Sequence, residues 1–417
     1  MLVMAQGMRL RFFVTGFLLA GALSILKPVP APAQQVSPLT LQAALDIADR
    51  QNLDLIAARR QQAVARAGIQ IASQRPNPTV NFEALRDDPH EGLFFDQPIE
   101  IGGKRGHRMD VARQQVTLTD KEIAALERQV RRQTRDAYYN LAFARADTER
   151  LGRMVQLAGR LKEIATERFH TGAVAELEVI QAEVGLARAQ ADYQVAGQHE
   201  KVALSQLNAL LNVPAAKSWD LANPLETLPE HVTLPNLLER AYQANPGLQR
   251  LTQEEKVEES RTRLLKAERI PNLGLEFGAD FNSPNNFNAG GRGQISVMIP
   301  LFSRNQGEIA QSLASRRVLQ GQIEATRRSV AGKVESGYLN LASRETQAEL
   351  YKQKLIPSTR RLESMAEESY RAGKADILTV LDAQRNAQDI ERQYLQSLYD
   401  LQTSFAALEE TVGAPLQ

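Results

Sequence analysis

The sequence predicts a mainly helical protein with a small membrane β-barrel that several copies of the chain complete together. Three observations lead to this prediction: a stretch with a period of two, very long helical segments without proline, and a duplication of the whole arrangement at an offset of about 200 residues. In residues 273–281 every odd position is apolar and every even position is glycine or acidic, which gives a strand one apolar face and one polar face.

The N-terminus has the three parts of a secretory signal peptide. Arg9 and Arg11 form its charged part, residues 12–26 its apolar part, and residues 31–33 a small-residue cleavage site. The apolar run is shorter than the roughly 20 residues that span a membrane. We therefore expect residues 1–33 to be removed from an exported chain.

The composition of the 417 residues excludes several classes of protein. A formal net charge of +1 gives no argument for nucleic acid as a partner. The absence of cysteine excludes disulfides, thiolate metal sites, a cysteine nucleophile and an acylated N-terminal cysteine. No later stretch is long and apolar enough for a transmembrane helix, which leaves strands or a surface helix for contact with lipid. Translation can begin at Met1 or at Met8.

Residues 34–213 form the first copy of the duplicated unit. Its predicted elements are a helical region at 40–75 with a break near 51–54, strands at about 79–86 and 93–99, and a long helical hairpin at about 103–211. The first helix of the hairpin contains no proline, which predicts a length near 100 Å at about 1.5 Å per residue.

Residues 236–417 form the second copy, after an irregular linker at 214–235. Its predicted elements are a helical region at 237–269 interrupted at 245–247, strands at about 272–282 and 293–300 joined by a polar tip, and a long helical hairpin at about 306–412. Pro357 should kink the long helix of this hairpin or mark a helix end.

The second helix of each hairpin has small or apolar residues at spacings of three and four, which indicates a coiled-coil seam with the first helix. In the first hairpin these residues are Leu177, Ile180, Val184, Ala187, Ala191, Val195, Gln198 and Val202. In the second hairpin they are Tyr394, Leu398, Leu401, Phe405, Leu408 and Val412.

The strands of one chain are too few to close a barrel, and open strand edges are not tolerated in lipid. Two chains would supply eight strands and three would supply twelve, so we expect an oligomer. The polar strand positions, among them Glu83, Glu276 and Asp280, would face the lumen, and the apolar positions would face lipid.

Two short stretches give the sequence a resemblance to a known family. The first is Tyr370, Arg371, Ala372 and Gly373, followed by DILTVLDA at 376–383, and the second is EIGGKR at 100–105. Together with the duplication and the strands, they resemble the outer-membrane efflux channel family, the TolC-like trimers. The second stretch resembles the heavy-metal, CzcC-type branch. Many relatives are lipoproteins, and this chain, which lacks cysteine, departs from them.

The resemblance implies a homotrimer, with a twelve-stranded β-barrel in the lipid of the outer membrane of a Gram-negative bacterium and a long α-helical barrel in the periplasm. It implies a passive exit duct that works with a periplasmic adaptor protein and an inner-membrane pump of the RND type. Heavy-metal cations (cobalt, zinc, cadmium, nickel or copper) are the expected cargo, and drugs or organic solutes are the alternative. A soluble periplasmic coiled-coil adaptor or scaffold is a different class, against which the strand at 273–281 argues.

The resemblance also assigns residues to the periplasmic tips of the hairpins. Gly172, Gly373, Tyr370 and Arg371 would form the turns and the surface on which the adaptor docks. A glycine at each turn is also expected as the C-cap of the preceding helix.

Asp382 and Asp376 are the residues that the resemblance places at the channel mouth. In a trimer Asp382 would form a ring of three carboxylates, which attracts cations and can form part of a gate. The alternative for Asp382 is a solvated helix residue paired with Arg385, and for Asp376 an ordinary tip charge. Gln181 occupies the corresponding position in the first copy, so we expect one ring in each trimer.

The sequence gives no sign of catalytic residues, a cofactor site or a metal site, so we expect no enzyme. The five histidines are scattered, and none lies three or four residues from another histidine, a spacing that metal sites use. Residues 102–105 (GGKR) lack the glycine spacing and the Lys-Ser/Thr ending of a phosphate-binding loop.

Overall fold

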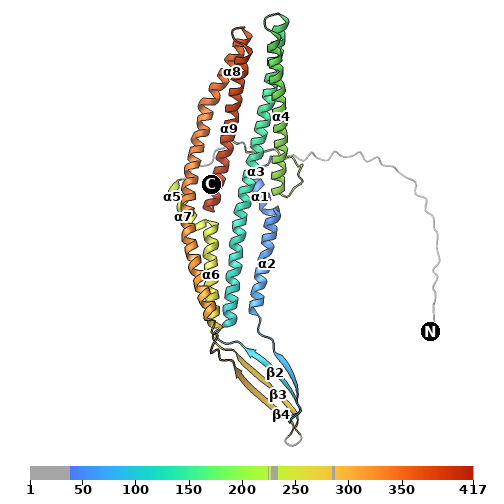
Figure 1. Ribbon diagram of the computed structural model, residues 1–417, viewed down its shortest axis with the longest axis vertical. Coiled ribbons are helices and arrows are strands. Elements are labelled where there is room, and N and C mark those ends of the chain that lie inside the picture. Colours follow the sequence, from blue (N-terminus) through green and yellow to red (C-terminus); the bar gives the residue numbers. More distant parts are fainter. Residues whose placement is uncertain (1–37, 224, 227–232, 284–286, 417) are drawn as a thin grey trace, which may run out of the picture. The chain divides into compact units, whose positions relative to one another are not determined.

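The computed structural model describes residues 38–223, 225–226, 233–283 and 287–416. Long helices make up most of this part of the chain, and one small sheet lies at one end of them (Figure 1). The predicted signal peptide and part of the predicted linker lie outside the described residues.

The order of helix pair, strand pair and helical hairpin occurs twice. The first set comprises α1 (Leu41–Gln51), α2 (Leu53–Ser73), β1 (Thr79–Ala84), β2 (Glu91–Ile99), α3 (Lys104–His170) and α4 (Glu176–Leu210). The second set comprises α5 (Leu234–Ala244), α6 (Pro246–Ala267), β3 (Leu273–Ser283), β4 (Phe287–Val297), α7 (Gln306–Leu350), the π-helical turn η1 (Tyr351–Leu355), α8 (Ile356–Arg371) and α9 (Ile377–Val412).

The long helices follow the distribution of proline. Helix α3 contains no proline and runs for 67 residues, about 100 Å at 1.5 Å per residue. The corresponding helix of the second hairpin is divided by η1, and Pro357 lies in the first turn of α8. A proline at that point needs no backbone N–H, so the predicted interruption is confirmed.

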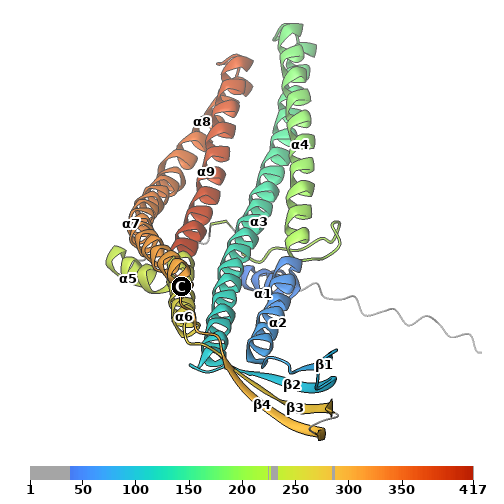
Figure 2. The ribbon, with the colours of Figure 1, turned by 60° about the horizontal axis from the view of Figure 1, so that its bottom comes forward.

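The strands form one antiparallel sheet in the order β1-β2-β3-β4 (Figure 2). Strand β4 differs from the prediction, because it begins at Phe287 and ends at Val297. The polar, glycine- and asparagine-rich stretch 282–292 led us to expect a tip there, but residues 289–292 pair in register with β3. Pairing stops at Val297 because its partner, Leu273, is the first residue of β3.

A buried asparagine joins the two short helices in each copy. Asn52 caps α2 and Asn245 caps α6, each accepting a hydrogen bond from a backbone N–H of the helix that follows. The Asn52 side chain also donates to the carbonyl of Leu210 at the end of α4 (3.2 Å), and Asn245 donates to the carbonyl of Thr411 at the end of α9 (2.6 Å). In each copy a single asparagine side chain thus caps the second short helix and attaches the junction between the two short helices to the end of the hairpin.

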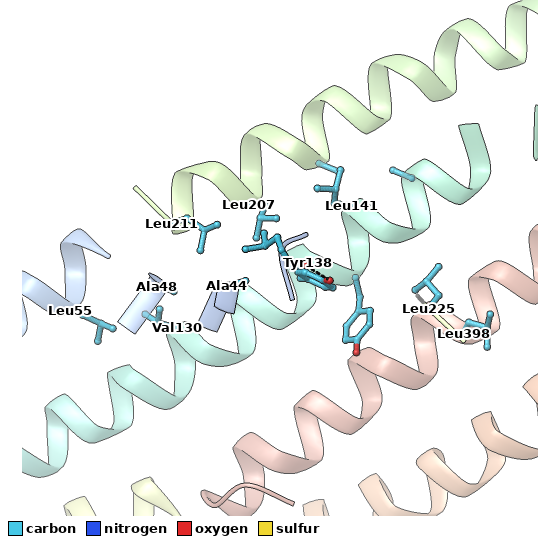
Figure 3. Packing of buried hydrophobic residues seen from close by; sticks show 14 of the residues in the cluster. Ala44, Ala48, Leu55, Val130, Tyr138, Leu141, Leu207, Leu211, Leu225 and Leu398 are labelled. Carbon is cyan, nitrogen blue, oxygen red and sulfur yellow. Dashed lines mark hydrogen bonds between the residues drawn. The ribbon is translucent and has the colours of Figure 1, made fainter. Parts of the chain in front are cut away.

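The main core lies where α1 and the end of α4 pack on the middle of α3 (Figure 3). Tyr138 is fully buried there, and its hydroxyl donates to the carbonyl of Leu39 (2.8 Å) and accepts from the amide of Asn223 (3.1 Å). Burial of a tyrosine is favourable when its hydroxyl has partners, and these partners come from the segments that flank the hairpin.

The seam predicted for α4 is wrong. All eight of its residues are exposed, among them Leu177, Val195 and Val202 at 62%, 56% and 55%. Helix α4 packs on α3 through alanines at every seventh position instead; these are Ala182, Ala189, Ala196 and Ala203. Small side chains let two helices approach closely, so the alanine stripe makes the closest contact with α3, and the larger residues lie outside that contact.

The seam predicted for α9 is confirmed. Leu398, Leu401, Phe405, Leu408 and Val412 are buried, and they pack with residues of α3, α5 and α7. The second helix of the first hairpin therefore packs through alanines, and the second helix of the second hairpin packs through larger apolar side chains.

Charged side chains also link α3 to α9. Arg132 pairs with Glu410 (2.6 Å), and Arg135 pairs with Glu409 (2.7 Å). Asp136 lies 3.5 Å from Arg132, and among the described residues its Oδ1 atom has no hydrogen-bond partner. Burial raises the pKa of Asp136 to about 6, although the Arg132 guanidinium opposes that rise.

Replacing Asn245 should weaken the second copy. Asn245→Ala removes the cap of α6 and leaves the Thr411 carbonyl without its donor, so we expect a loss of about 1–3 kcal/mol of unfolding free energy. Denaturation of the detergent-solubilised protein measures it. Asn340→Ala, at an exposed position of α7, is the control and should change stability by less than about 0.5 kcal/mol. Equal stability of the two variants would contradict the assigned role.

Asp136→Asn should stabilise the protein at neutral pH but not in acid. Because the pKa of Asp136 is higher in the folded state than in the unfolded state, the folded state binds more protons between about pH 4 and pH 6. The unfavourable effect of the carboxylate therefore grows as pH rises through this window. We expect the variant to gain about 1–2 kcal/mol at pH 7.5, after allowance for partial exposure and the lost Arg132 contact, and nothing near pH 4.

Thermal unfolding at the two pH values tests the Asp136 prediction. Asp110→Asn is the control, because its side chain is 52% exposed on the same helix. A gain for Asp136→Asn that is independent of pH would show that the carboxyl does not titrate as described.

Candidate functional site

Both hairpin turns are closed by a glycine with a left-handed backbone. Gly172 has φ +72° and Gly373 has φ +68°. At the first turn Ala173 N–H donates to the Arg168 carbonyl (2.9 Å), and at the second Lys374 N–H donates to the Ser369 carbonyl (2.9 Å). These are Schellman caps, so the predicted C-cap role of both glycines is confirmed.

Tyr370 joins the tips of the two hairpins. Its hydroxyl donates to Glu178 Oε2 on α4 (2.8 Å), and Arg168 on α3 donates to its carbonyl (2.8 Å) while the guanidinium lies 4.5 Å from its ring centroid. Burial and the bond to the Glu178 carboxylate raise the pKa of Tyr370 to about 12. The phenol is therefore neutral and acts as a hydrogen-bond donor at physiological pH.

The prediction that Tyr370 contributes to an exposed docking surface is wrong in this structure, because its side chain is 0% exposed. Arg371 does lie on the surface, paired with Glu367 (2.6 Å). The sequence reasoning missed Arg168 and Glu178. A signal existed: the residue that corresponds to Tyr370 in the first copy is Phe169, so only the second copy has a hydroxyl that needs a buried partner.

The two acidic residues assigned to the channel mouth have different environments. Asp376 is the N-cap of α9 and accepts from the amide (3.0 Å) and the hydroxyl (2.6 Å) of Thr379, whose hydrogen bonds lower the pKa of the carboxyl. Asp382 has a side chain that is 76% exposed and lies 3.8 Å from Arg385. Asp376 therefore has a structural task at the helix start, whereas the Asp382 carboxylate is open to solvent.

The strand residues assigned to the lumen lie on one face of the sheet and converge on Arg292 of β4. Its guanidinium nitrogens are 3.7 Å from Glu83, 3.8 Å from Glu276 and 3.6 Å from Asp280. Because Arg292 on β4 reaches Glu83 on β1 across two intervening strands, the sheet curls toward this polar face.

The opposite face of the sheet is mainly apolar and open. The most exposed of its large apolar side chains are Val80 (65%), Phe82 (68%), Phe277 (56%) and Ile295 (73%). The alternation predicted from the sequence thus separates a curled-in polar face from an exposed apolar face.

The GGKR stretch forms a joint between the sheet and the helices. Lys104 donates to Asn272 next to β3, and Arg105 donates to the Ser73 carbonyl at the end of α2 (2.6 Å). Arg108 pairs with Glu100, and this hydrogen bond lowers the pKa of the Glu100 carboxyl. Gly102 and Gly103 have positive φ, which allows the chain to leave β2 and start α3 at once.

Two features are absent from the described residues. No helix there combines the length and apolarity that crossing a membrane requires. No group of three or more histidine, aspartate or glutamate side chains in the described part of the chain is arranged to hold a metal ion.

A family model described as outer membrane efflux protein matches residues 44–213 and 237–414. The chain therefore belongs to the outer membrane efflux protein family. It is 24% identical over 418 residues to the cobalt-zinc-cadmium resistance protein CzcC of Cupriavidus metallidurans, with 99% of each protein covered. Its function as an efflux channel and its location in the outer membrane, both predicted from the sequence, are confirmed.

Solved structures support the fold class. The chain is similar to the outer-membrane channel OprN, with a TM-score of 0.74 at 15% identity over 90% of each chain. It is also similar to CusC, with a TM-score of 0.73 at 17% identity over 90% of this chain and 92% of that one. The mainly helical fold with a small strand portion is confirmed.

Tyr370→Phe should loosen the contact between the two hairpin tips. Loss of the hydroxyl leaves Glu178 without its donor and should cost about 0.5–1.5 kcal/mol, which corresponds to amide exchange about twofold to tenfold faster around residues 365–380. Hydrogen exchange measured by mass spectrometry tests this. Tyr351→Phe is the matched control, because its hydroxyl bonds to Gln393 at an exposed site. Unchanged amide exchange in Tyr370→Phe would show that the hydroxyl does not stabilise the contact between the tips.

Proposed function

We propose that three copies of this chain form a passive duct through the outer membrane, which conducts heavy-metal cations that an inner-membrane pump of the RND type delivers through a periplasmic adaptor. The observation that carries the proposal is the curl of the sheet toward its charged face, with the apolar face outside. A barrel completed by three such sheets has water and charge inside and apolar side chains against lipid.

The exposed stripe on α4 supports assembly. Leu177, Ile180, Val184, Val195 and Val202 are apolar, lie along one side of the helix and are between 48% and 62% exposed. A stripe of this length on a helix is an expected contact with another helix, and a second copy of the chain supplies one.

Heavy-metal cations are the cargo that the sequence and charge favour. The name of the relative CzcC refers to cobalt, zinc and cadmium resistance. The polar sheet face has more carboxylates than cations, which favours cations over anions in a water-filled lumen. Organic solutes are the second candidate, because the GGKR stretch on which the metal resemblance rests makes structural hydrogen bonds within the chain.

The tips are the proposed site of adaptor docking and of the gate. Gly172, Gly373 and Arg371 lie at or beside the turns and are exposed. Asp382 of the three copies would form a carboxylate ring at the mouth, for which an exposed, weakly paired carboxylate is suited. Asp376, as the cap of α9, would shape this mouth by fixing where the helix begins.

Reconstitution of the purified mature chain tests the proposal. We expect a trimer in detergent and stepwise, cation-selective conductance in planar bilayers. A polypeptide that stays monomeric and dissolves without detergent would contradict the duct. Asp382→Asn should lower the ratio of cation to anion permeability by about twofold or more, because it removes three negative charges from the mouth. Asp110→Asn is the control for the loss of an exposed carboxylate, and an equal ratio in both variants would exclude the ring.

A further inference from the structure

Arg292 is the one basic residue in the four strands as the structure bounds them. The polar face that it shares also has four carboxylates, which belong to Glu83, Asp96, Glu276 and Asp280. The formal charge of this face is therefore −3 in each chain, and Arg292 supplies the only positive charge among these described strand residues.

The side chain of Arg292 is held in place by the residues beside it on β2 and β3. Gly278 pairs with both Phe94 and Arg292. A Cβ atom on Gly278 would lie 2.2 Å from the Leu93 carbonyl oxygen and 2.6 Å from the Phe94 ring, so glycine is required for the ring to lie across this strand. The guanidinium then stacks on the ring, 3.7 Å from its centroid, and Phe94 is only 1% exposed.

The carboxylates that meet at Arg292 come from different strands. Glu83 lies on β1, Glu276 and Asp280 lie on β3, and all three oxygens are within 3.8 Å of one guanidinium. Their side chains are 46%, 25% and 15% exposed in that order, so water reaches the group. Without the guanidinium, three negative groups would converge on one wet position, where they would repel one another and attract a cation strongly.

Conduction requires that a permeating ion bind weakly enough to leave. Carboxylate oxygens that converge on one point hold divalent cations more tightly than dispersed carboxylates do. We propose that Arg292 determines the permeability of the duct to divalent cations, by acting as a fixed internal counter-ion at the point where the three carboxylates meet. The remaining negative charge attracts cations into the lumen, while the guanidinium prevents their retention. This inference rests on the proposed lumenal position of the polar face.

Block of the channel by Co²⁺ tests the inference. In bilayers with KCl as the conducting salt, added CoCl₂ should block the wild-type channel only weakly. In Arg292→Gln the concentration for half block should fall by about tenfold or more, because the carboxylates are no longer neutralised. Arg292→Lys keeps the charge and should stay within about threefold of the wild type. Arg304→Gln, which removes an exposed arginine outside the strands, is the matched control and should not change the block.

Two further variants guard against loss of folding. Arg292→Met retains an apolar stem on Phe94 without the charge and should reproduce the increased block if Arg292→Gln does not assemble. Adding Glu276→Gln and Asp280→Asn to either variant should restore the weak block of the wild type, because the converging charges are removed together.

The outcomes distinguish a wrong role for Arg292 from a wrong proposed function. A trimer of Arg292→Gln or Arg292→Met that conducts and is blocked by Co²⁺ as weakly as the wild type would overturn the role of Arg292 and leave the duct intact. A wild-type protein without conductance would overturn the proposed function itself. Increased block that persists after the two carboxylates are removed would also overturn the inference, because the cation would then be held elsewhere.

Discussion

The open edges of the sheet are the constraint on which the rest of the structure depends. Within one chain β1 and β4 each pair with a strand on one side only. Backbone N–H and C=O groups without partners are costly in hydrocarbon, so a chain of this kind needs further copies before its sheet can face lipid. The curl toward the charged face and the outward apolar stripe of α4 are consistent with the same need, since both leave surface that a single chain does not cover.

The duplication is maintained by repeated local chemistry rather than by similar side chains overall. Asn52 and Asn245 make the same cap and the same long-range bond, and both hairpins turn on a glycine with positive φ. The copies differ where the chemistry is specific. Tyr370 and Asp382 occur in the second copy only, where the first has Phe and Gln. The two copies therefore share the same helices and strands. The contact between the tips depends on the hydroxyl of Tyr370, which the first copy lacks.

The sequence predicted the elements whose signal is local. A period of two located the strands, and the absence of proline gave α3 its length. It failed for the α4 seam, because that helix has two stripes with the spacing of a seam, and the larger residues were taken for the inner one. Which stripe faces α3 depends on the residues of α3 itself, and the sequence pattern of α4 alone gives no information about them. Burial of Tyr370 was missed for the same reason, since its partners Arg168 and Glu178 are about 200 residues away in sequence.

The alanines of α4 have a geometric consequence. A repeat of seven residues does not match the 3.6-residue turn of a straight helix, which drifts by about 20° over each repeat. To keep Ala182, Ala189, Ala196 and Ala203 against α3, the two helices must wind around each other with a left-handed twist. The layer between their backbones is then only about a methyl group deep. The packing between α3 and α4 is therefore close, and the bulkier side chains of α4 lie outside this layer, where they remain about half exposed or more.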